Sequence, residues 1–264
     1  MTILMRTTTK MSDGAYSSFA EVYDTLMDDI DYDAWAAYYR DLLLDASGET
    51  PKRLGRVVEC ACGTGSITAR LAAFGFQMLG VDLSPQMLRV AERKMRDFGV
   101  SVPLVCQDMT RLDVPGRAGA VLCTCDGLNY LREPGDVLKF FERCRSVLKP
   151  GGLLCLDVST RAKLQGQIGN AFLGEERPGM AYLWQNTWND ETQSVRMDIT
   201  FFVQEADGRY RRFREEHRLR AYSEAELREM LAAAGFDGVE CFGEMTRRAS
   251  QPEDMRIHIR AQSA

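Results

Sequence analysis

The stretch 57-VVECACGTG-65 decides the fold. It begins as an apolar run of strand length, reaches Gly63 and Gly65, and continues into a helical pattern over 67–74. Glycines at such a turn let the backbone approach a ligand closely, and the following helix start offers free N–H groups. The stretch therefore predicts the first strand, turn and helix of an α/β domain, with a ligand close to the turn.

Strand-length apolar runs alternate with helical patterns along residues 56–157. The runs lie at 56–60, 77–81, 103–106, 118–124 and 153–157, and the helical patterns at 67–74, 85–98 and 135–148. Strands separated by helices pair in parallel through right-handed crossovers. We therefore predict a doubly wound α/β sheet, which a final hairpin of 239–242 and 255–261 completes.

From about residue 180 the pattern changes to strict alternation of apolar and polar side chains, which is typical of antiparallel strands. Turn signals divide this region into three strands, at 180–188, 193–204 and 209–222. We predict a three-stranded insertion in the α/β domain. The expected organisation is a tail and helical lid at 1–50, a cofactor-binding α/β domain at 51–165 and 223–264, and an antiparallel β cap over the substrate at 166–222.

Length and charge exclude several classes of protein. The chain has 264 residues, of which 45% are apolar and 27% charged, as expected for one large domain with an insertion. A net charge of -5 argues against a nucleic acid partner. Because no apolar run has the length of a membrane span or the form of a signal peptide, we expect a cytoplasmic protein.

Cysteines are numerous, yet their positions favour free thiols. Six of the eight lie within or just beyond strand-like apolar runs, at Cys60, Cys62, Cys106, Cys123, Cys125 and Cys155. A chain of this size needs no disulfides to fold. The one-residue spacing of the first two and of the fourth and fifth does not suit structural zinc, so we expect no metal.

Acidic residues end the first two predicted strands and define the ligand. Asp82 is placed to accept hydrogen bonds from ribose hydroxyls. A nicotinamide-binding domain would share this feature, but its third glycine is replaced here by Thr68. Glu59 puts an anion before the glycines, where it would repel a pyrophosphate. The residues therefore favour a nucleoside that carries a cationic group.

Four segments in order resemble the motifs of the class I S-adenosylmethionine-dependent methyltransferases. They are Glu59-x-x-Cys62-Gly63-Thr64-Gly65, Val81-Asp82-Leu83-Ser84, Gln107-Asp108-Met109 and Leu148-Lys149-Pro150-Gly151-Gly152. The resemblance covers roughly 56–157 and, more weakly, the terminal helix and hairpin. It implies a Rossmann-like sheet of seven strands and S-adenosylmethionine as the cofactor.

The resemblance also implies roles for individual residues. Glu59 and the loop of Cys62, Gly63, Thr64 and Gly65 would hold the amino acid end of the cofactor, Asp82 its ribose, Leu83 and Met87 one face of the adenine, and Asp108 with the Met109 amide the adenine edge. Many members have aspartate where this chain has Glu59. Its side chain is one methylene longer, which allows a contact through water.

The segment 125–131 follows the fourth strand at the ligand-binding edge of the sheet. It resembles the corresponding loop of bacterial small-molecule methyltransferases, and we place its first residue, Cys125, beside the cofactor. Asp126 or Asn129 would orient an acceptor amine or hydroxyl. Alternatively, both merely cap the next helix, a position that these residue types favour.

Aromatic residues before the sheet are candidates to cover the cofactor. The element 23-YDTLM-27 is similar to one in the same bacterial methyltransferases. Aromatic faces stabilise a cation, so Tyr16 and Tyr23 would favour the positive sulfonium.

The strand 209–222 carries a candidate base. His217 shares a side with apolar residues and would take a proton near neutral pH, oriented by Glu215; a purely structural histidine is the alternative. Six arginines against two glutamates on this strand would suit an acidic small molecule, a phosphate or RNA, although most such runs are solvated faces.

We therefore predict methyl transfer by in-line displacement from S-adenosylmethionine to a nitrogen or oxygen of a small-molecule acceptor. One alternative is an RNA-modifying methyltransferase that uses the arginines of 209–220. A nicotinamide dehydrogenase and a non-catalytic S-adenosylmethionine-binding protein are the others.

Overall fold

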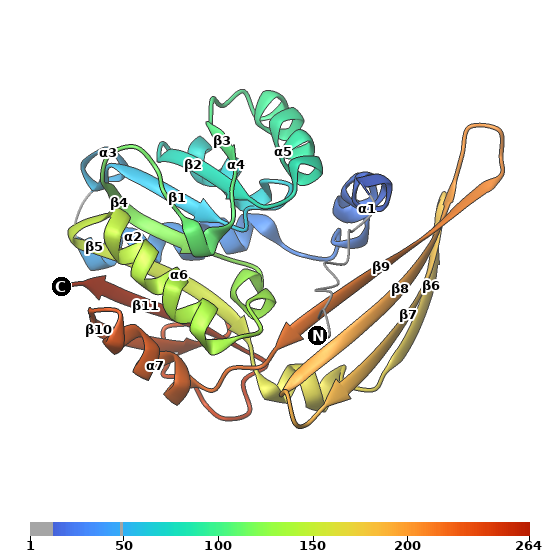
Figure 1. Cartoon of the computed structure of the whole chain (residues 1–264). Helices are drawn as coiled ribbons and strands as arrows, with labels where there is room; N and C mark the ends of the chain where they lie inside the picture. Colours follow the sequence, from blue (N-terminus) through green and yellow to red (C-terminus); the bar gives the residue numbers. More distant parts are fainter. Residues whose placement is uncertain (1–12, 48–49) are drawn as a thin grey trace, which may run out of the picture.

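A computed structural model describes residues 13–47 and 50–264, and its core is a seven-stranded sheet (Figure 1). The strands, in the order β10-β11-β5-β4-β1-β2-β3, are β1 (Arg56–Cys60), β2 (Gln77–Asp82), β3 (Leu104–Cys106), β4 (Ala118–Cys123), β5 (Leu148–Ser159), β10 (Phe236–Gly243) and β11 (Arg256–Ser263). Strands β1 to β5 pair in parallel, whereas β11 is antiparallel to both β5 and β10. The predicted seven-stranded Rossmann-like sheet is confirmed.

Helices cover both faces of this sheet. They are α2 (Tyr32–Ser47), α3 (Pro51–Leu54), α4 (Ser66–Ala73), α5 (Pro85–Asp97), α6 (Pro134–Val147) and α7 (Glu224–Ala233). Successive strand residues serve opposite faces: Val57 packs with Leu42 of α2, whereas Val58 packs with Phe140 of α6. Burial on both faces explains why β1 and β4 are almost continuously apolar.

Local signals fix where two of the helices begin. The Ser84 hydroxyl accepts a hydrogen bond from the Met87 amide at 3.2 Å, and Pro85 follows as the first helical residue of α5. Helix α7 begins with a capping box in which Ser223 and Glu226 bond each other's backbone amides. The first of these caps places the start of α5 where the sequence predicts it.

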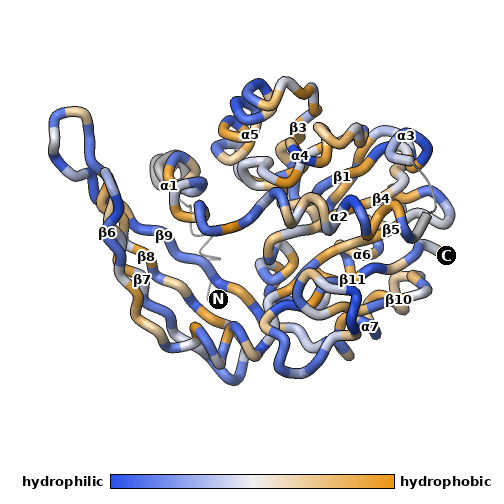
Figure 2. Tube along the Cα trace, turned by 180° about the vertical axis from the view of Figure 1, so that it is seen from behind, coloured by the Kyte–Doolittle hydropathy of each residue, from blue (hydrophilic) through white to orange (hydrophobic). Residues whose placement is uncertain are grey.

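A second, four-stranded antiparallel sheet stands beside the first one (Figure 1). Its order is β6 (Phe172–Arg177), β7 (Met180–Asn189), β8 (Ser194–Gln204) and β9 (Tyr210–Arg220). The predicted insertion has three strands, so β6 is an addition. This edge strand is almost entirely exposed and ends in three charged residues, so it lacks the alternation that identifies a half-buried strand. Figure 2 shows hydrophobic and hydrophilic positions alternating along β8.

Helix α1 (Asp13–Leu26) lies between the two sheets (Figure 1). Phe19, Val22 and Leu26 form one apolar cluster with Phe201 of β8 and Met87 of α5. The helix therefore contacts both parts of the molecule. Its packing holds the inner face of the antiparallel sheet against the carboxyl edge of the parallel strands.

All eight cysteines are free thiols, as the sequence predicts. Cys60 and Cys123 are buried side by side in the sheet on neighbouring strands, where burial raises the pKa of both thiols. Such thiols act as small apolar residues. Among residues 13–47 and 50–264, no helix combines the length and the apolar composition that crossing a bilayer requires.

Candidate functional site

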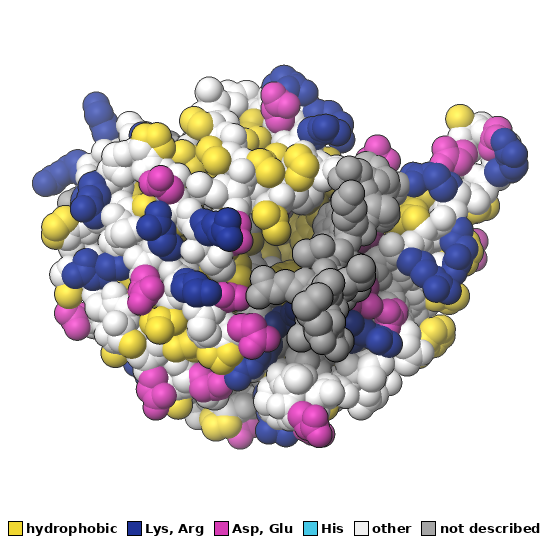
Figure 3. Space-filling model, viewed as in Figure 1, with side chains coloured by type: hydrophobic (Ala, Val, Ile, Leu, Met, Phe, Trp, Pro, Cys, Tyr) yellow, Lys and Arg dark blue, Asp and Glu magenta, His cyan; other side chains and the backbone are white. Residues whose placement is uncertain are grey.

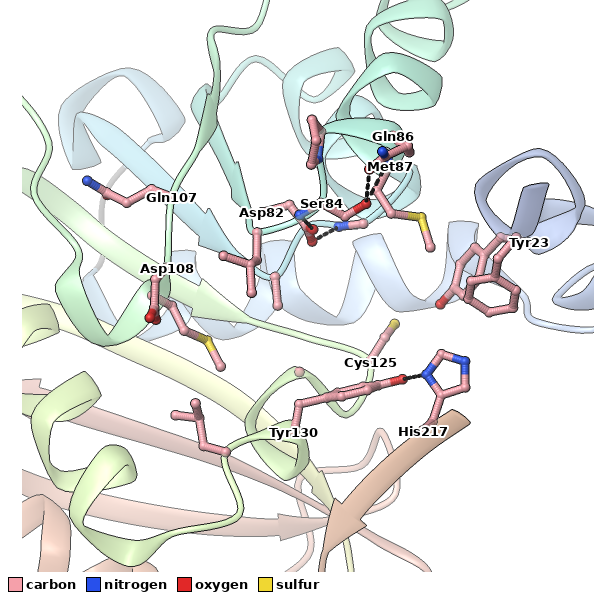
Figure 4. Close-up of a pocket in the computed structure, with 18 residues that line it drawn as sticks. Tyr23, Asp82, Ser84, Gln86, Met87, Gln107, Asp108, Cys125, Tyr130 and His217 are labelled. Carbon is pink, nitrogen blue, oxygen red and sulfur yellow. Dashed lines mark hydrogen bonds between the residues drawn. The ribbon is translucent and has the colours of Figure 1, made fainter. Parts of the chain in front are cut away.

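A cleft of about 540 Å³ opens at the carboxyl edge of the parallel strands (Figure 4). Its walls come from the loops after β1, β2, β3 and β4, from α1 and from β9. A recess of about 40 Å³ adjoins it beside the first glycine loop. Tyr23, Ala61, Gly63 and Cys125 line both spaces, so they lie where the cleft and the recess meet.

The glycine loop after β1 has a left-handed backbone that residues other than glycine rarely adopt. Gly63 and Gly65 have φ angles of +53° and +73°. A Cβ atom at Gly65 would lie 2.6 Å from Met95 Cε and 3.1 Å from Ala91 Cβ of α5. This position therefore requires glycine both for its left-handed backbone and for the close packing of α5. The first turn of α4 is thereby held beside the cleft.

Asp82 joins the first loop to the second. Its Oδ2 accepts a hydrogen bond from the Gly63 amide and its Oδ1 accepts one from the Ser84 amide, both at 2.8 Å. Burial raises the pKa of this carboxyl, and the backbone hydrogen bonds act against that rise. Each carboxylate oxygen can accept more than one hydrogen bond, and Asp82 lines the cleft. Asp82 can therefore also accept hydrogen bonds from the hydroxyl groups of a ligand bound there.

The part of the cleft formed by the segments after β2 and β3 presents apolar side chains and one carboxyl group. Leu83 lines the cleft with 70% of its surface exposed, and Met87 and Met109 line it as well. Asp108 Oδ1 accepts hydrogen bonds from the Thr110 amide and hydroxyl at 2.8 Å. Leu83 and the two methionines form an apolar surface against which the flat ring of a ligand could pack. The Asp108 carboxyl group lies next to this surface and could bind a polar edge of that ring.

Glu59 lies at the floor of the recess and is almost fully buried. The hydroxyl groups of Thr68 and Thr124 donate hydrogen bonds to its two oxygens, the latter at 2.7 Å. Burial raises the pKa of Glu59 to about 7, although both hydroxyls lower it. Cys62 and Thr64 also line the recess. Of the residues predicted to hold the amino acid end of a cofactor, all but Gly65 thus line this recess.

Helix α1 is fastened to this loop by a polar cluster. Asp24 Oδ1 accepts hydrogen bonds from the Thr64 hydroxyl at 2.7 Å and from Lys94 Nζ at 2.9 Å. Lys94 also donates to the Thr64 and Ser66 hydroxyls. The Thr64 side chain therefore points toward α1. This arrangement places Tyr23, the neighbour of Asp24, at the junction of cleft and recess.

An aromatic group and a histidine close the far end of the cleft. Tyr130 Oη lies 3.2 Å from His217 Nδ1, and the Phe19 ring centroid lies 5.0 Å from that of His217 (Figure 4). Burial lowers the pKa of His217 to about 4, so the imidazole is neutral near pH 7 and does not titrate there as the sequence suggests. His217 Nε2 is buried and makes no hydrogen bond within the described part of the chain.

Asp126 and Asn129 do not line the cleft. Asp126 pairs with Arg256 and accepts a hydrogen bond from Ser159 Oγ at 2.6 Å. Burial raises the pKa of Asp126, but the nearby positive charges of Arg256 and Lys163 lower it by more than that rise. The carboxyl group therefore stays ionised. The geometry therefore does not support the expectation that Asp126 orients an acceptor.

The Asn129 amide has structural partners as well. Its Nδ2 donates to the Ser159 and Arg220 carbonyl oxygens at 3.0 and 2.8 Å, and its Oδ1 accepts from the Ser159 amide at 3.0 Å. Asn129 thus ties the loop after β4 to β5 and β9, and the expected acceptor contact is not supported. Cys125, by contrast, does line the cleft. Tyr16 belongs to α1, but its side chain lies outside the described residues.

Sequence reasoning missed two aromatic side chains of the cleft. Phe19 stands four residues before Tyr23, a spacing that puts both on one face of α1, and their ring centroids are 5.5 Å apart. Tyr130 lies within the segment 125–131 that was singled out for its position after β4. Helical spacing and position in that loop were therefore the signals that would have found them.

Comparison with known proteins agrees with this geometry. Residues 57–152 match a family model described as "Methyltransferase domain". YqeM of Bacillus subtilis (strain 168), which its name gives provisionally as a methyltransferase, is 34% identical over 252 residues, spanning 94% of this chain and 97% of YqeM.

Solved structures extend the likeness to the whole fold. An S-adenosylmethionine-dependent methyltransferase from Clostridium acetobutylicum ATCC 824 is 29% identical, with a TM-score of 0.83 over 94% of this chain and 98% of that one. CalS10 of Micromonospora echinaspora, an amino pentose methyltransferase solved with S-adenosylmethionine bound, is 23% identical and shares the fold, with a TM-score of 0.70 over 92% of this chain and 97% of its own. This chain belongs to the class I methyltransferases, enzymes that use S-adenosylmethionine as their methyl donor.

Proposed function

We propose that this enzyme transfers a methyl group to a nitrogen or oxygen of a small-molecule acceptor held beside Tyr130 and His217. The observation that carries the proposal is the enclosure of this end of the cleft by α1 and β9. A volume of about 540 Å³ lies in the range of small-molecule sites. The helical lid and the antiparallel sheet would then act as the cap that selects the acceptor.

The residues present fit the cofactor. Asp82 would bind the ribose, Leu83 and Met87 the adenine face, Asp108 and the Met109 amide its edge, and Glu59 with the loop 62–65 the amino acid end. The glycine loop supports this fit, because Gly63 lines both spaces and nothing lies within 4 Å of the position that its Cβ would take. When bound, S-adenosylmethionine supplies an electrophilic methyl carbon on a positively charged sulfur that leaves as a neutral thioether.

Tyr23 and Cys125 are the residues we place nearest to the reacting centre. Both line the cleft and the recess, so they lie where the nucleoside and amino acid ends of a bound cofactor would join. The Tyr23 ring would favour a cation there. Burial also raises the pKa of Tyr23, so its hydroxyl remains protonated and uncharged. Tyr16 keeps the same proposed role.

His217 would orient the acceptor rather than carry a charge. When His217 Nδ1–H donates to the Tyr130 oxygen, the buried Nε2 is left as an acceptor for an N–H or O–H group of the bound molecule. Such a contact aligns the acceptor lone pair with the methyl carbon. Orientation and the exclusion of water supply most of the rate in a direct displacement.

The arginines of β9 give little support to RNA as the acceptor. Arg212, Arg214 and Arg218 are exposed, and they project from the face opposite to His217 because neighbouring strand residues point to opposite sides. Figure 3 shows basic side chains gathered over the antiparallel sheet. Arg218 also pairs with Glu216 at 2.7 Å. A polyanion bound on that outer face would not reach the cleft.

Radiolabelled methyl transfer tests the proposal. The enzyme is incubated with methyl-labelled S-adenosylmethionine and with either a small-molecule extract or total RNA, and the two fractions are counted separately. We expect label in the small-molecule fraction and equal activity when the salt concentration is raised. Label confined to RNA, with steep inhibition by salt, would contradict the proposal.

A further inference from the structure

Glu215 is a buried carboxyl group without a partner. Its side chain is 6% exposed, its Oε1 is fully buried, and no hydrogen bond or ion pair joins it to any residue in the described ranges. It lies two residues before His217 on β9, so both side chains project from the inner face of the antiparallel sheet. His217 Nε2 is likewise buried and unpaired.

The strand residues opposite this pair are apolar. Across the sheet, Ile199 lies opposite Glu215 and Met197 lies opposite His217, and both are buried. The next residue in the Glu215 row is Trp184 of β7, whose Nε1 already donates to Asn186 Oδ1 at 2.6 Å. The protein groups in register with Glu215 therefore offer its carboxyl no donor.

Such a carboxyl is costly to retain in the folded protein. Burial alone raises the pKa of Glu215 to about 7, and no neighbouring charge contributes. An ionised group in an apolar site needs a partner of opposite charge or a set of donors. Groups kept in this condition serve a ligand more readily than they serve stability. A ligand that enters from the side of His217 would provide the missing partner.

We propose that Glu215 binds a protonated amine of the methyl acceptor, which makes a basic amine the substrate class of this enzyme. Glu215 does not itself line the cleft, but it adjoins His217, which does. The inference therefore rests on the proposed function and requires the acceptor amine to reach past His217. An ammonium group neutralises the carboxylate and donates hydrogen bonds to it, whereas an alcohol leaves the buried charge uncompensated and an acid is repelled.

Glu215 would also receive the proton that the amine must lose before it is methylated. In this step an ammonium N–H bond breaks, its electron pair stays on nitrogen as the attacking lone pair, and the proton forms an O–H bond on the carboxylate. The carboxylic acid returns the proton to water when the product leaves. His217 Nε2 would accept a second N–H and hold the nitrogen in line with the methyl carbon.

The stability of Glu215→Gln tests whether the carboxyl lacks a protein partner. Because the pKa is higher in the folded chain than in the unfolded chain, the native protein loses stability as pH rises from about 5 to about 7, and the neutral glutamine avoids that loss. We expect E215Q to melt above the wild type at about pH 8 and level with it at about pH 5. The control Glu216→Gln, on the outer face, should show no such pH-dependent gain. A lower melting point for E215Q at about pH 8 would overturn the proposal.

Binding of matched probes tests the ligand class. Cyclohexylamine and cyclohexanol, and benzylamine and benzyl alcohol, are titrated into each protein with saturating S-adenosylhomocysteine, and binding is followed by thermal shift and calorimetry. We expect at least one amine to bind the wild type at least tenfold more tightly than its alcohol, and E215Q to lose that preference while E216Q keeps it. Equal binding of amines and alcohols, an amine preference that survives in E215Q, or no amine response in the wild type would each overturn the inference. The shift caused by S-adenosylhomocysteine alone tests the cofactor assignment separately.

Discussion

Tyr130 Oη and His217 Nδ1 lie 3.2 Å apart, although the two residues stand 87 positions apart in the chain. Tyr130 ends the short turn after β4, whereas His217 belongs to β9 of the antiparallel sheet. Their contact therefore joins the cofactor-binding part of the molecule to the sheet that covers it. A single hydrogen bond of this kind defines the direction in which the remaining histidine nitrogen faces.

Replacing His217 with alanine should lower kcat/KM by about 100-fold, because the acceptor loses the contact that orients it and a small misplacement at the reacting centre costs that much. S-adenosylmethionine should bind as tightly as before, since the predicted cofactor residues lie on other elements. Tyr130→Phe removes only the hydroxyl, worth about 1 kcal/mol or roughly a fivefold loss. Steady-state kinetics with calorimetry of cofactor binding measures both. An H217A enzyme with unchanged turnover at saturating acceptor would exclude the role of His217.

Gly65→Ala should reduce both stability and cofactor affinity. The left-handed backbone costs about 1 kcal/mol, and the collision of the new methyl with Met95 Cε, 2.6 Å away, adds about 1–3 kcal/mol. Gly75→Ala is a matched control, because Gly75 has a φ of +92° but nothing within 4 Å of a Cβ. Urea unfolding and S-adenosylmethionine titration compare the two. Equal losses of stability in both variants would show that packing against α5 is unimportant.

Asp24→Asn should loosen α1 from the cofactor loop. The variant loses the charge that pairs with Lys94 Nζ at 2.8 Å and weakens the contact with the Thr64 hydroxyl. We expect S-adenosylmethionine to bind several-fold more weakly and α1 to exchange its amide hydrogens faster, measured by hydrogen exchange. Asp28→Asn is the control, since its partner Arg177 belongs to β6. Unchanged exchange in α1 of D24N would count against the lid.

The features that the sequence predicts correctly depend on interactions between residues close together in the chain. The strand, turn and helix around Gly63, the acid at Asp82 and the cap at Ser84 all act within a few residues, and the structure keeps them. The alternation along β8 predicts that strand for the same reason. These elements position the predicted cofactor residues around one cleft and recess.

Long-range contacts explain what the sequence misses. Asp126 looks free for catalysis until Arg256, 130 positions away, is seen to pair with it. His217 looks titratable near neutral pH until packing buries it against Phe19. In each case the residue that determines the charge or burial of the side chain belongs to a distant element. The sequence around the side chain gives no sign of that contact.

Arg256→Met should be the most damaging of these changes to stability. Arg256 neutralises both Asp126 and Asp157, and Asp157 in turn accepts hydrogen bonds from the Cys125 and Asp126 amides at 2.7 and 3.1 Å. Without the guanidinium, the buried Asp157 carboxylate and the half-buried Asp126 carboxylate face each other, at a cost of about 3–5 kcal/mol.

The pH dependence of this loss has a definite sign. In the wild type the pKa of Asp126 is held below its usual range, so its ion pair stabilises the fold above about pH 4 and weakens under stronger acid. In R256M the Asp126 carboxyl would lose the charge that most lowers its pKa, so the deficit in unfolding free energy should be largest near pH 7 and shrink toward pH 4. Arg218→Met, which breaks only the exposed pair with Glu216, should cost less than about 1 kcal/mol at every pH. Urea unfolding across this range would contradict the account if the two variants lost equal stability.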